Sequence, residues 1–290
     1  MTPFSCPLCS STDKKRSWLT LSFMDKLFAY DECLVCRSLI CRPMPDESVL
    51  SRMYDASYCE TADSYGEDAS LAKFSGVLDF LRTLAVGTFI DFGCGDGKLL
   101  LAVKAMGWDV SGIDFNPEFA VSAKAAGIPV TSPHEPVSEL ADVLHLGDVL
   151  EHLTDLNNQF PEIINRLKHG GYLIAHGPLE ANSNLFFKVI RLGKRLRGSK
   201  PTDMPPFHVI LATTTGQLCL FERFSFAEVA LQIDEIAFPA AEQLTSKELR
   251  HARSIALFLL RKTSQLFSRF NTHDSGNRYF YVGRRLGSGG

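Results

Sequence analysis

A glycine-rich stretch at residues 89–97, FIDFGCGDG, is the first candidate for a binding site. Glycine lets a ligand approach the backbone closely where a buried strand turns into a helix. The spacing does not fit a phosphate-binding P-loop, because Lys98 is followed by leucine, and its third glycine comes one residue too early for a dinucleotide-binding loop. Asp91 would repel a pyrophosphate but attract a ligand that carries ammonium and sulfonium charges. We therefore expect a cationic ligand at this loop.

Four cysteines near the start of the chain have the spacing of a metal site. They form two C-x-x-C pairs, CPLC with Cys6 and Cys9 and CLVC with Cys33 and Cys36. Two such turns supply the four thiolates of a tetrahedral zinc site. A redox dithiol would need only one pair, and disulfides would require a secreted protein. We predict a structural zinc, which leaves no open coordination position for catalysis.

Acidic and histidine residues after a second apolar run could carry proton transfer. Asp148, Glu151 and His152 lie in DVLEH, directly behind the run ADVLHLG. DVLE also has the pattern of a helix capping box, so its two carboxylates have a structural alternative. His152, with an ordinary pKa of about 6.5, suits a general base or a substrate contact. His176 and His208 are weaker candidates, because a lone histidine more often makes a structural hydrogen bond.

The elements that would position these residues alternate between strands and helices. From residue 88 to residue 178, short apolar runs alternate with segments of helical periodicity. This alternation predicts an α/β fold with a doubly wound, mainly parallel sheet and helices on both faces. In such a sheet the ligand lies beyond the carboxyl ends of the strands, where the first strand turns into a helix. Near the end, RYFYVGRRL predicts a final strand inserted antiparallel.

These motifs together resemble a known family. IDFGCGDG resembles motif I of the class I S-adenosylmethionine-dependent methyltransferases, and the resemblance continues through VSGIDFNP, ADVLHLGDVLEHL and RLKHGGYLIAHGP over roughly residues 70–182. It implies a Rossmann-like, seven-stranded sheet and S-adenosylmethionine as the cofactor. The cysteine pairs and the following RPMPDESVLSRMYDASY are similar to a subgroup that carries a zinc ribbon before this domain and acts on nucleotide-linked sugars and other small metabolites.

The resemblance also assigns roles to single residues of this chain. Gly93 and Gly95 would let the methionine portion of the cofactor approach the backbone. Asp91 would interact with the ammonium group of that portion, directly or through water. Asp114 would hold the ribose hydroxyls, and Phe115 would lie against the adenine.

Beyond the third predicted strand the chain departs from the family. Many members have an aspartate there for the adenine amino group, whereas this chain reads TSPHEP. His134 or Glu135 would have to replace that aspartate, or a backbone carbonyl would serve. Asp148 is a further candidate cofactor contact, because it follows the fourth predicted strand on the ligand-binding edge. The Glu-His pair at 151–152 is similar to one often found at this place in related enzymes.

We divide the chain into three parts. These are a zinc ribbon at residues 1–45, a helical linker and cofactor-covering segment at 46–85, and a methyltransferase domain at 86–286 with an insertion at about 183–207. The net charge of −3 provides no basic field, so a nucleic-acid partner is unlikely on this ground. Because the N-terminal sequence lacks the features of a signal peptide and no apolar run is long enough for a bilayer, we expect a cytoplasmic protein.

Two late segments are strongly basic. Residues 184–200 contain six lysine or arginine residues and no acid, and residues 247–270 contain six against one acid. The plainest interpretation is that of solvated helices. The insertion would otherwise cover the acceptor site and attract an anionic acceptor, such as a nucleotide-linked or lipid-linked sugar, or these segments would contact an anionic membrane as a peripheral surface.

The function predicted from the sequence is methyl transfer from S-adenosylmethionine to a small-molecule or glycan-precursor acceptor, on oxygen or carbon. The candidate base is His152 with Glu151, and His208 is next. A nucleic-acid methyltransferase that binds through the ribbon is one alternative, although the sequence shows no aromatic-lined basic channel. A non-catalytic module that only binds the cofactor is another. The sequence makes no prediction about the oligomeric state.

Overall fold

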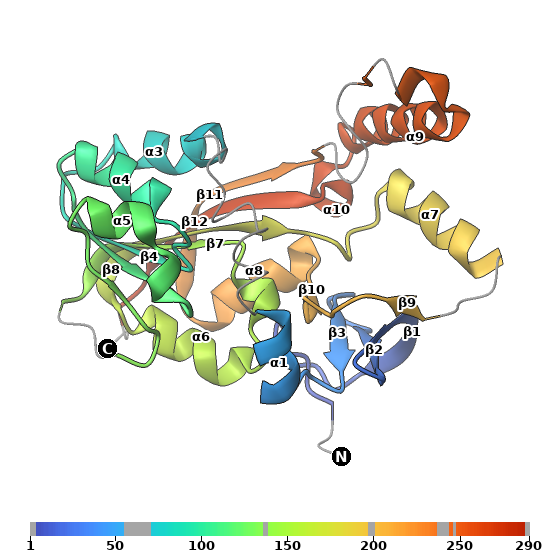
Figure 1. Cartoon of the computed structure of the whole chain (residues 1–290), viewed down its shortest axis with the longest axis horizontal. Coiled ribbons are helices and arrows are strands. Elements are labelled where there is room, and N and C mark those ends of the chain that lie inside the picture. Colours follow the sequence, from blue (N-terminus) through green and yellow to red (C-terminus); the bar gives the residue numbers. More distant parts are fainter. Residues whose placement is uncertain are drawn as a thin grey trace.

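The computed structural model describes residues 4–54, 71–135, 139–196, 201–236, 244–245 and 248–287. Residues 55–70 of the predicted linker, residues 197–200 of the predicted insertion and Lys247 lie outside the described residues. Two sheets organise the described chain, one of seven strands and one of five (Figure 1).

The larger sheet has the strand order β11-β12-β8-β7-β4-β5-β6. Neighbouring strands are parallel, except that β12 is antiparallel to both β8 and β11. The predicted doubly wound, mainly parallel, seven-stranded sheet is therefore confirmed, and so is the antiparallel last strand. The strands are β4 (Thr88–Phe92), β5 (Asp109–Ile113), β6 (Val130–Thr131), β7 (Ala141–Gly147), β8 (Leu167–Pro178), β11 (Phe226–Asp234) and β12 (Arg278–Arg285).

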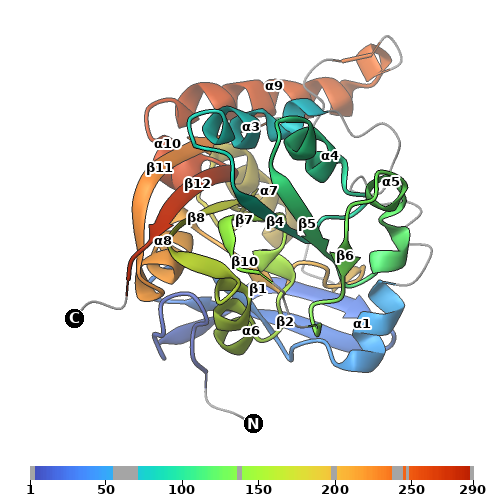
Figure 2. The same ribbon diagram turned by 90° about the vertical axis from the view of Figure 1, so that its left-hand side faces the viewer.

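Helices cover both faces of this sheet (Figure 2). Helices α3 (Ser75–Leu81), α4 (Lys98–Ala105) and α5 (Val121–Ala125) pack on one face. Helices α6 (Leu156–Ile164) and α8 (Thr214–Arg223) pack on the other. Within α4, Leu99, Leu100 and Val103 recur at helical spacing, so they form one buried side against the sheet.

The smaller sheet joins the N-terminal segment to residues far along the chain. Its order is β10-β3-β2-β1-β9. Strand β9 lies within the predicted insertion, and β10 follows directly after it. The buried ribbon side chains also share one core with α6 and α8. The N-terminal segment that was predicted as a ribbon at residues 1–45 therefore packs against the main domain and shares its core. The strands are β1 (Lys14–Phe23), β2 (Lys26–Cys33), β3 (Leu39–Arg42), β9 (Thr202–Asp203) and β10 (Ile210–Leu211).

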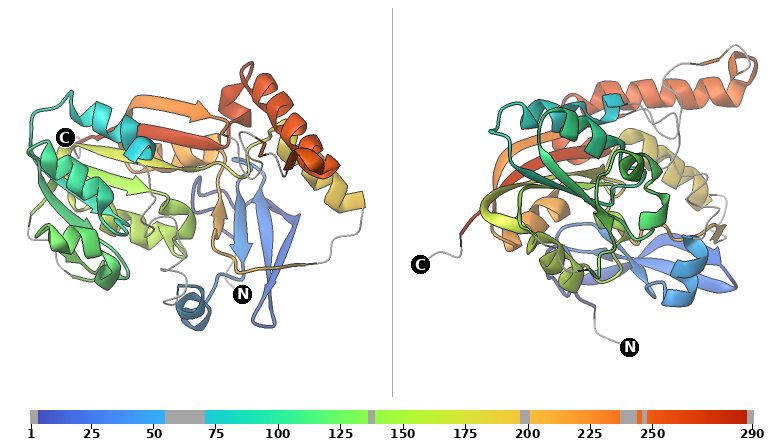
Figure 3. Two further views of the ribbon diagram at one scale, coloured as in Figure 1. Left: turned by 45° about the horizontal axis from the view of Figure 1, so that its top comes forward. Right: turned by 60° about the vertical axis from the view of Figure 1, so that its left-hand side comes forward.

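Two helices extend beyond the carboxyl ends of β8 and β11 (Figure 3). They are α7 (Leu185–Leu196), which follows β8, and α9 (Ala252–Ser268), which packs against it. Within the described ranges, none of the helices has both the length and the apolarity to cross a bilayer. The remaining elements are short: α1 (Glu47–Met53), η1 (Leu71–Phe74), η2 (Pro117–Phe119), η3 (Leu150–His152), η4 (Glu248–Arg250) and α10 (Thr272–Ser275).

Candidate functional site

A cleft of about 470 Å³ lies at the carboxyl ends of β4, β5 and β7, where a doubly wound sheet binds its ligand. Tyr54, which directly follows α1, and Lys73 of the turn η1 belong to its walls. Among the residues predicted to bind or react, His134, Glu151 and His208 do not line the cleft. Those that do line it are Asp91, Gly93, Gly95, Asp114, Phe115, Asp148, His152 and the weaker candidate His176.

The loop between β4 and α4 needs glycine for two different reasons. Gly93 has a φ of +79°, and a Cβ there would lie 2.6 Å from Val149 Cγ2 at the cleft wall. Gly97 has a φ of +83°, and a Cβ there would lie 2.4 Å from Ala123 Cβ on α5. Left-handed backbone and such close approaches exclude other residues. The loop is thus held against both the cleft and the neighbouring helix.

Asp114, at the end of β5, fixes this loop and faces the cleft. Its Oδ2 accepts a hydrogen bond of 2.8 Å from the Gly95 amide, and its Oδ1 accepts one of 2.9 Å from the Asn116 amide. The side chain is buried, and it lines the cleft. A carboxylate oxygen accepts two hydrogen bonds, so Asp114 has the capacity to bind ligand hydroxyls in the cleft while it holds the loop.

A buried histidine that the sequence analysis missed is paired with Asp91. His145 and Asp91 are register neighbours on β7 and β4, and the His145 Nδ1 lies 2.7 Å from the Asp91 Oδ1. The His176 ring lies 5.0 Å from the His145 ring, and burial, together with His145, lowers the pKa of His176 to about 3. His145 sits within an apolar run, where a polar side chain needs a partner, and this was the available signal.

The capping-box alternative for Asp148 and Glu151 is wrong. Asp148 has a φ of +53°, and its carboxylate pairs with Arg278 on β12 at 2.8 Å. Burial opposes ionisation of Asp148, but the Arg278 guanidinium outweighs it and holds the pKa of the carboxyl below its usual range. The next element is the short turn η3, which has no side-chain cap hydrogen bond, and α6 begins only at Leu156.

His152 lines the cleft, and one of its ring nitrogens is engaged in hydrogen bonds. Its Nδ1 lies 2.8 Å from the Phe207 carbonyl oxygen and 2.9 Å from the Tyr54 hydroxyl. Because a carbonyl only accepts, the proton of the neutral ring is on Nδ1, which leaves the lone pair on Nε2. Burial and the neighbouring His208 lower the pKa of His152 to about 4. The ring is therefore a neutral proton acceptor at ordinary pH.

Glu151 and His208 lie behind His152. The His208 ring is 4.9 Å from the His152 ring, and its Nδ1 is 2.7 Å from Glu180 Oε2. Burial opposes a charge on His208, but Glu180 outweighs it and raises the pKa of His208 to about 9. Burial, with the charge of Asp148, raises the pKa of Glu151 to about 8.

The same three side chains also satisfy a distance criterion for cation binding. One ligand atom each of Glu151, His152 and His208 lies within 4.8 Å of the others. The Glu151 Oε1 is buried and has no hydrogen-bond partner within the described chain. These three side chains could therefore bind a divalent cation instead of serving in proton transfer. A chelator would inhibit turnover only if they bind a cation.

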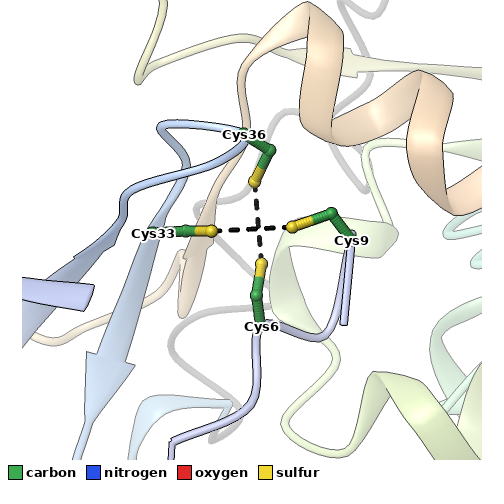
Figure 4. A group of neighbouring side chains, drawn as sticks. All are labelled: Cys6, Cys9, Cys33 and Cys36. Carbon is green, nitrogen blue, oxygen red and sulfur yellow. Dashed lines mark hydrogen bonds between the residues drawn. The ribbon is translucent and has the colours of Figure 1, made fainter. Parts of the chain in front are cut away.

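The four predicted zinc ligands converge at the edge of the ribbon (Figure 4). Their sulfur atoms all lie within 4.8 Å of one another, with Cys6 and Cys36 3.6 Å apart and Cys9 and Cys33 3.5 Å apart. A tetrahedron of 2.3 Å zinc–sulfur bonds has edges of about 3.8 Å, so the cluster fits zinc closely. It contributes no residue to the cleft.

The strand order, the glycine loop and the acidic residue after the second strand together define the class I methyltransferase fold. The model of the methyltransferase domain family matches residues 65–227. The chain therefore belongs to this methyltransferase family, and the resemblance noted in the sequence is confirmed.

Known proteins similar to this chain include one curated enzyme and many solved structures. The ubiquinone biosynthesis O-methyltransferase of Proteus mirabilis (strain HI4320) is 27% identical over 160 residues, which are 50% of this chain and 62% of that protein. The structure of the PH0226 protein from Pyrococcus horikoshii OT3 has a TM-score of 0.50 and 14% identity, and covers 80% of this chain and 99% of its own. A SAM-dependent methyltransferase from Archaeoglobus fulgidus has a TM-score of 0.44 and 14% identity over 83% of this chain and 100% of its own. At this identity the PH0226 structure shows the fold alone.

Proposed function

We propose that the protein transfers a methyl group from S-adenosylmethionine to an oxygen or carbon of a small molecule or glycan precursor. The observation that carries this proposal is that His152, a neutral imidazole with its Nδ1 held by the Phe207 carbonyl, lines the same cleft as Asp114 and the glycine loop. A non-catalytic module that only binds the cofactor would not need a neutral histidine, protonated on Nδ1, beside the donor site. The Proteus mirabilis relative, an O-methyltransferase by name, favours oxygen as the acceptor atom.

The chain's residues would bind the methyl donor along the cleft. Asp114 would accept the ribose hydroxyls, and Asp91, held by His145, would face the ammonium group. Phe115 is exposed at the cleft wall, where its ring is available to the adenine. His134 is exposed outside the cleft lining, so a backbone group is the better candidate for the adenine amino group.

The bound cofactor supplies an electrophilic methyl group on a sulfonium. Transfer to the acceptor would form an O–CH3 or C–CH3 bond while the S–CH3 bond breaks and leaves its electron pair on sulfur. The acceptor's proton passes to His152 Nε2, whose ring is oriented by the Phe207 carbonyl. The positive charge of His208 would favour prompt loss of that proton to water, because two adjacent imidazolium rings repel each other.

We propose that the acceptor is anionic and contacts the basic side chains of the cleft. Lys73 and Lys98 line it beside the carboxylates of Asp91, Asp114 and Asp148, the last of which is paired with Arg278. No described residue of α7 lines the cleft, and cover of the acceptor site by the basic insertion stays a prediction. We also infer a reducing, cytoplasmic setting, because none of the seven described cysteines forms a disulfide bond.

Incubating the protein with methyl-labelled S-adenosylmethionine and a metabolite extract tests the proposed function. We expect label in a small, dialysable product whose formation needs the native protein and stops with His152→Ala. Label that appears only in added RNA or DNA would instead support the nucleic-acid alternative. Binding of the cofactor without any transfer would support a non-catalytic module.

We also propose that the four clustered cysteines hold one structural zinc. Elemental analysis of protein purified without chelator should give one zinc per chain. Cys33→Ser should lose that zinc and lower the Tm by about 5 °C or more, because the ribbon shares its core with α6 and α8. Cys219→Ser is the matched control, since this free thiol lies outside the cluster and should leave the zinc in place. Four freely titrating thiols in metal-free protein would contradict this assignment.

A further inference from the structure

Helix α9 turns a polar side toward the body of the protein. Arg261 and Ser264 are fully buried, and both donate to the Glu235 carboxylate just after β11, at 2.8 and 2.7 Å. Ser268 donates to the other oxygen of the same carboxylate. The Arg261 guanidinium also lies 3.7 Å from the Phe186 ring centre, which ties α9 to α7. The orientation of α9 is therefore fixed by a buried polar network.

The opposite side of α9 is apolar and exposed. Leu259, Leu266 and Phe267 are each more than half exposed, and Phe270, just after the helix, is 84% exposed. Leu192 of α7 adds to this surface with 56% exposure. A helix on the surface of a globular protein normally buries its apolar side and exposes its polar side. Here the order is reversed, which marks the outward face as an interaction surface.

The charged residues of α7 and α9 that flank this surface are all basic. Arg253 and Arg269 are exposed on or next to α9, Lys262 is partly exposed, and Lys188 is exposed on α7. Neither helix contains an aspartate or glutamate. A partner with an apolar interior and a negative surface matches this combination. A second copy of the chain fits less well, because a symmetric pair would place these basic residues against one another.

We propose that the outward face of α7 and α9 docks on an anionic lipid bilayer. Neither helix is able to span the bilayer, so the mode is interfacial: the leucine and phenylalanine side chains enter the acyl boundary while the arginines and lysines contact lipid headgroups. Both helices follow the carboxyl ends of sheet strands, β8 and β11, and the cleft lies at the same edge of the sheet. Docking would therefore bring the cleft close to a lipid-linked or membrane-dissolved acceptor. Docking itself does not depend on the proposed reaction.

Co-sedimentation with lipid vesicles tests this proposal directly. The full chain should bind vesicles of phosphatidylcholine with about 30% phosphatidylglycerol, and bind pure phosphatidylcholine about tenfold less or weaker still. Raising the salt concentration should weaken the binding. The double variant Phe267→Ser/Phe270→Ser should reduce binding to anionic vesicles by about tenfold or more, because two exposed apolar anchors are lost.

The matched control, Leu27→Ser/Val121→Ser, replaces two apolar residues elsewhere that are also more than half exposed, and it should bind the vesicles like the native chain. Both double variants should keep native binding of S-adenosylmethionine, so a failure of docking is separable from a failure of the proposed function. Equal binding of neutral and anionic vesicles, or no binding, would overturn the proposal. A native dimer that Phe267→Ser/Phe270→Ser dissociates would also overturn it, by showing that a second copy occupies the face.

Discussion

Replacing Asp114 with alanine is expected to weaken S-adenosylmethionine binding by about 2–4 kcal/mol, or about 30- to 700-fold. Two effects add. The variant loses the charge-assisted hydrogen bonds to the ribose, and it also frees the Gly95 and Asn116 amides that the carboxylate now holds. Equilibrium dialysis with labelled cofactor measures the change.

Asp96→Ala separates the two effects. Asp96 is also a buried carboxylate of the glycine loop, but it binds the Ser122 amide and hydroxyl at 2.9 and 2.6 Å and does not line the cleft. This variant should be less stable while it keeps cofactor affinity within about fivefold, a change of about 1 kcal/mol. If Asp114→Ala bound the cofactor as tightly as Asp96→Ala, the assignment of Asp114 to the ribose would fail.

Replacing His152 with alanine should reduce kcat by about 10²- to 10⁴-fold and leave cofactor affinity within about threefold. The variant removes the acceptor for the proton but none of the groups proposed to bind the donor. Since the pKa of His152 is lowered to about 4, its neutral form prevails above about pH 5. The native rate should therefore show no His152 inflection between about pH 5 and pH 8, and it should fall only as the pH drops through about 4. Steady-state rates across this range provide the check.

Glu151→Gln tests whether the neighbouring carboxylate takes part. Burial raises the pKa of Glu151 to about 8, so the residue is a neutral acid at pH 7, and glutamine should preserve most of the rate there. The folded-state pKa is raised above the unfolded value, so the native protein loses stability as the pH rises from about 4.5 through about 8. The glutamine variant should therefore have the higher Tm at pH 8.5. A much lower rate at pH 7 would give Glu151 a catalytic role.

A chelator that leaves the ribbon zinc in place distinguishes the base from a cation site. Turnover should be unchanged if the His152 Nε2 takes the proton. Loss of turnover that an added divalent cation restores would show instead that Glu151, His152 and His208 hold a metal.

The local motifs of the site could be predicted from the sequence. The glycine loop depends on backbone freedom, which only glycine provides, so Gly93 and Gly97 mark it in the sequence itself. The alternation of strands and helices fixed the position of Asp114 at a strand end, on the ligand-binding edge. The cysteine pairs likewise carry their own spacing rule.

The partners of the site residues could not be predicted, because they come from distant parts of the chain. Arg278 reaches Asp148 from the last strand, and Tyr54 reaches His152 from the first helix. DVLE has the local pattern of a cap, but the left-handed backbone at Asp148 and its ion pair with Arg278 prevent a capping box. Spacing within a motif contains no information about such contacts.

The contacts of the ribbon and of the outer helix α9 could not be predicted either, because they also involve distant parts of the chain. Strands β9 and β10 contribute only two residues each to the ribbon sheet, too few for a recognisable pattern. In α9 the apolar residues have helical spacing, which normally indicates a buried side. The buried side is polar instead because Glu235 requires Arg261, Ser264 and Ser268 as partners.

The central claim is that the cleft at β4 and β5 binds S-adenosylmethionine, and isothermal titration of the native protein tests it most directly. We expect one molecule of S-adenosylmethionine per chain, with a Kd of about 1–100 μM, and no measurable heat with NAD, whose pyrophosphate Asp91 would repel. Tighter binding of NAD than of S-adenosylmethionine, or no binding of S-adenosylmethionine at about 1 mM, would contradict the account.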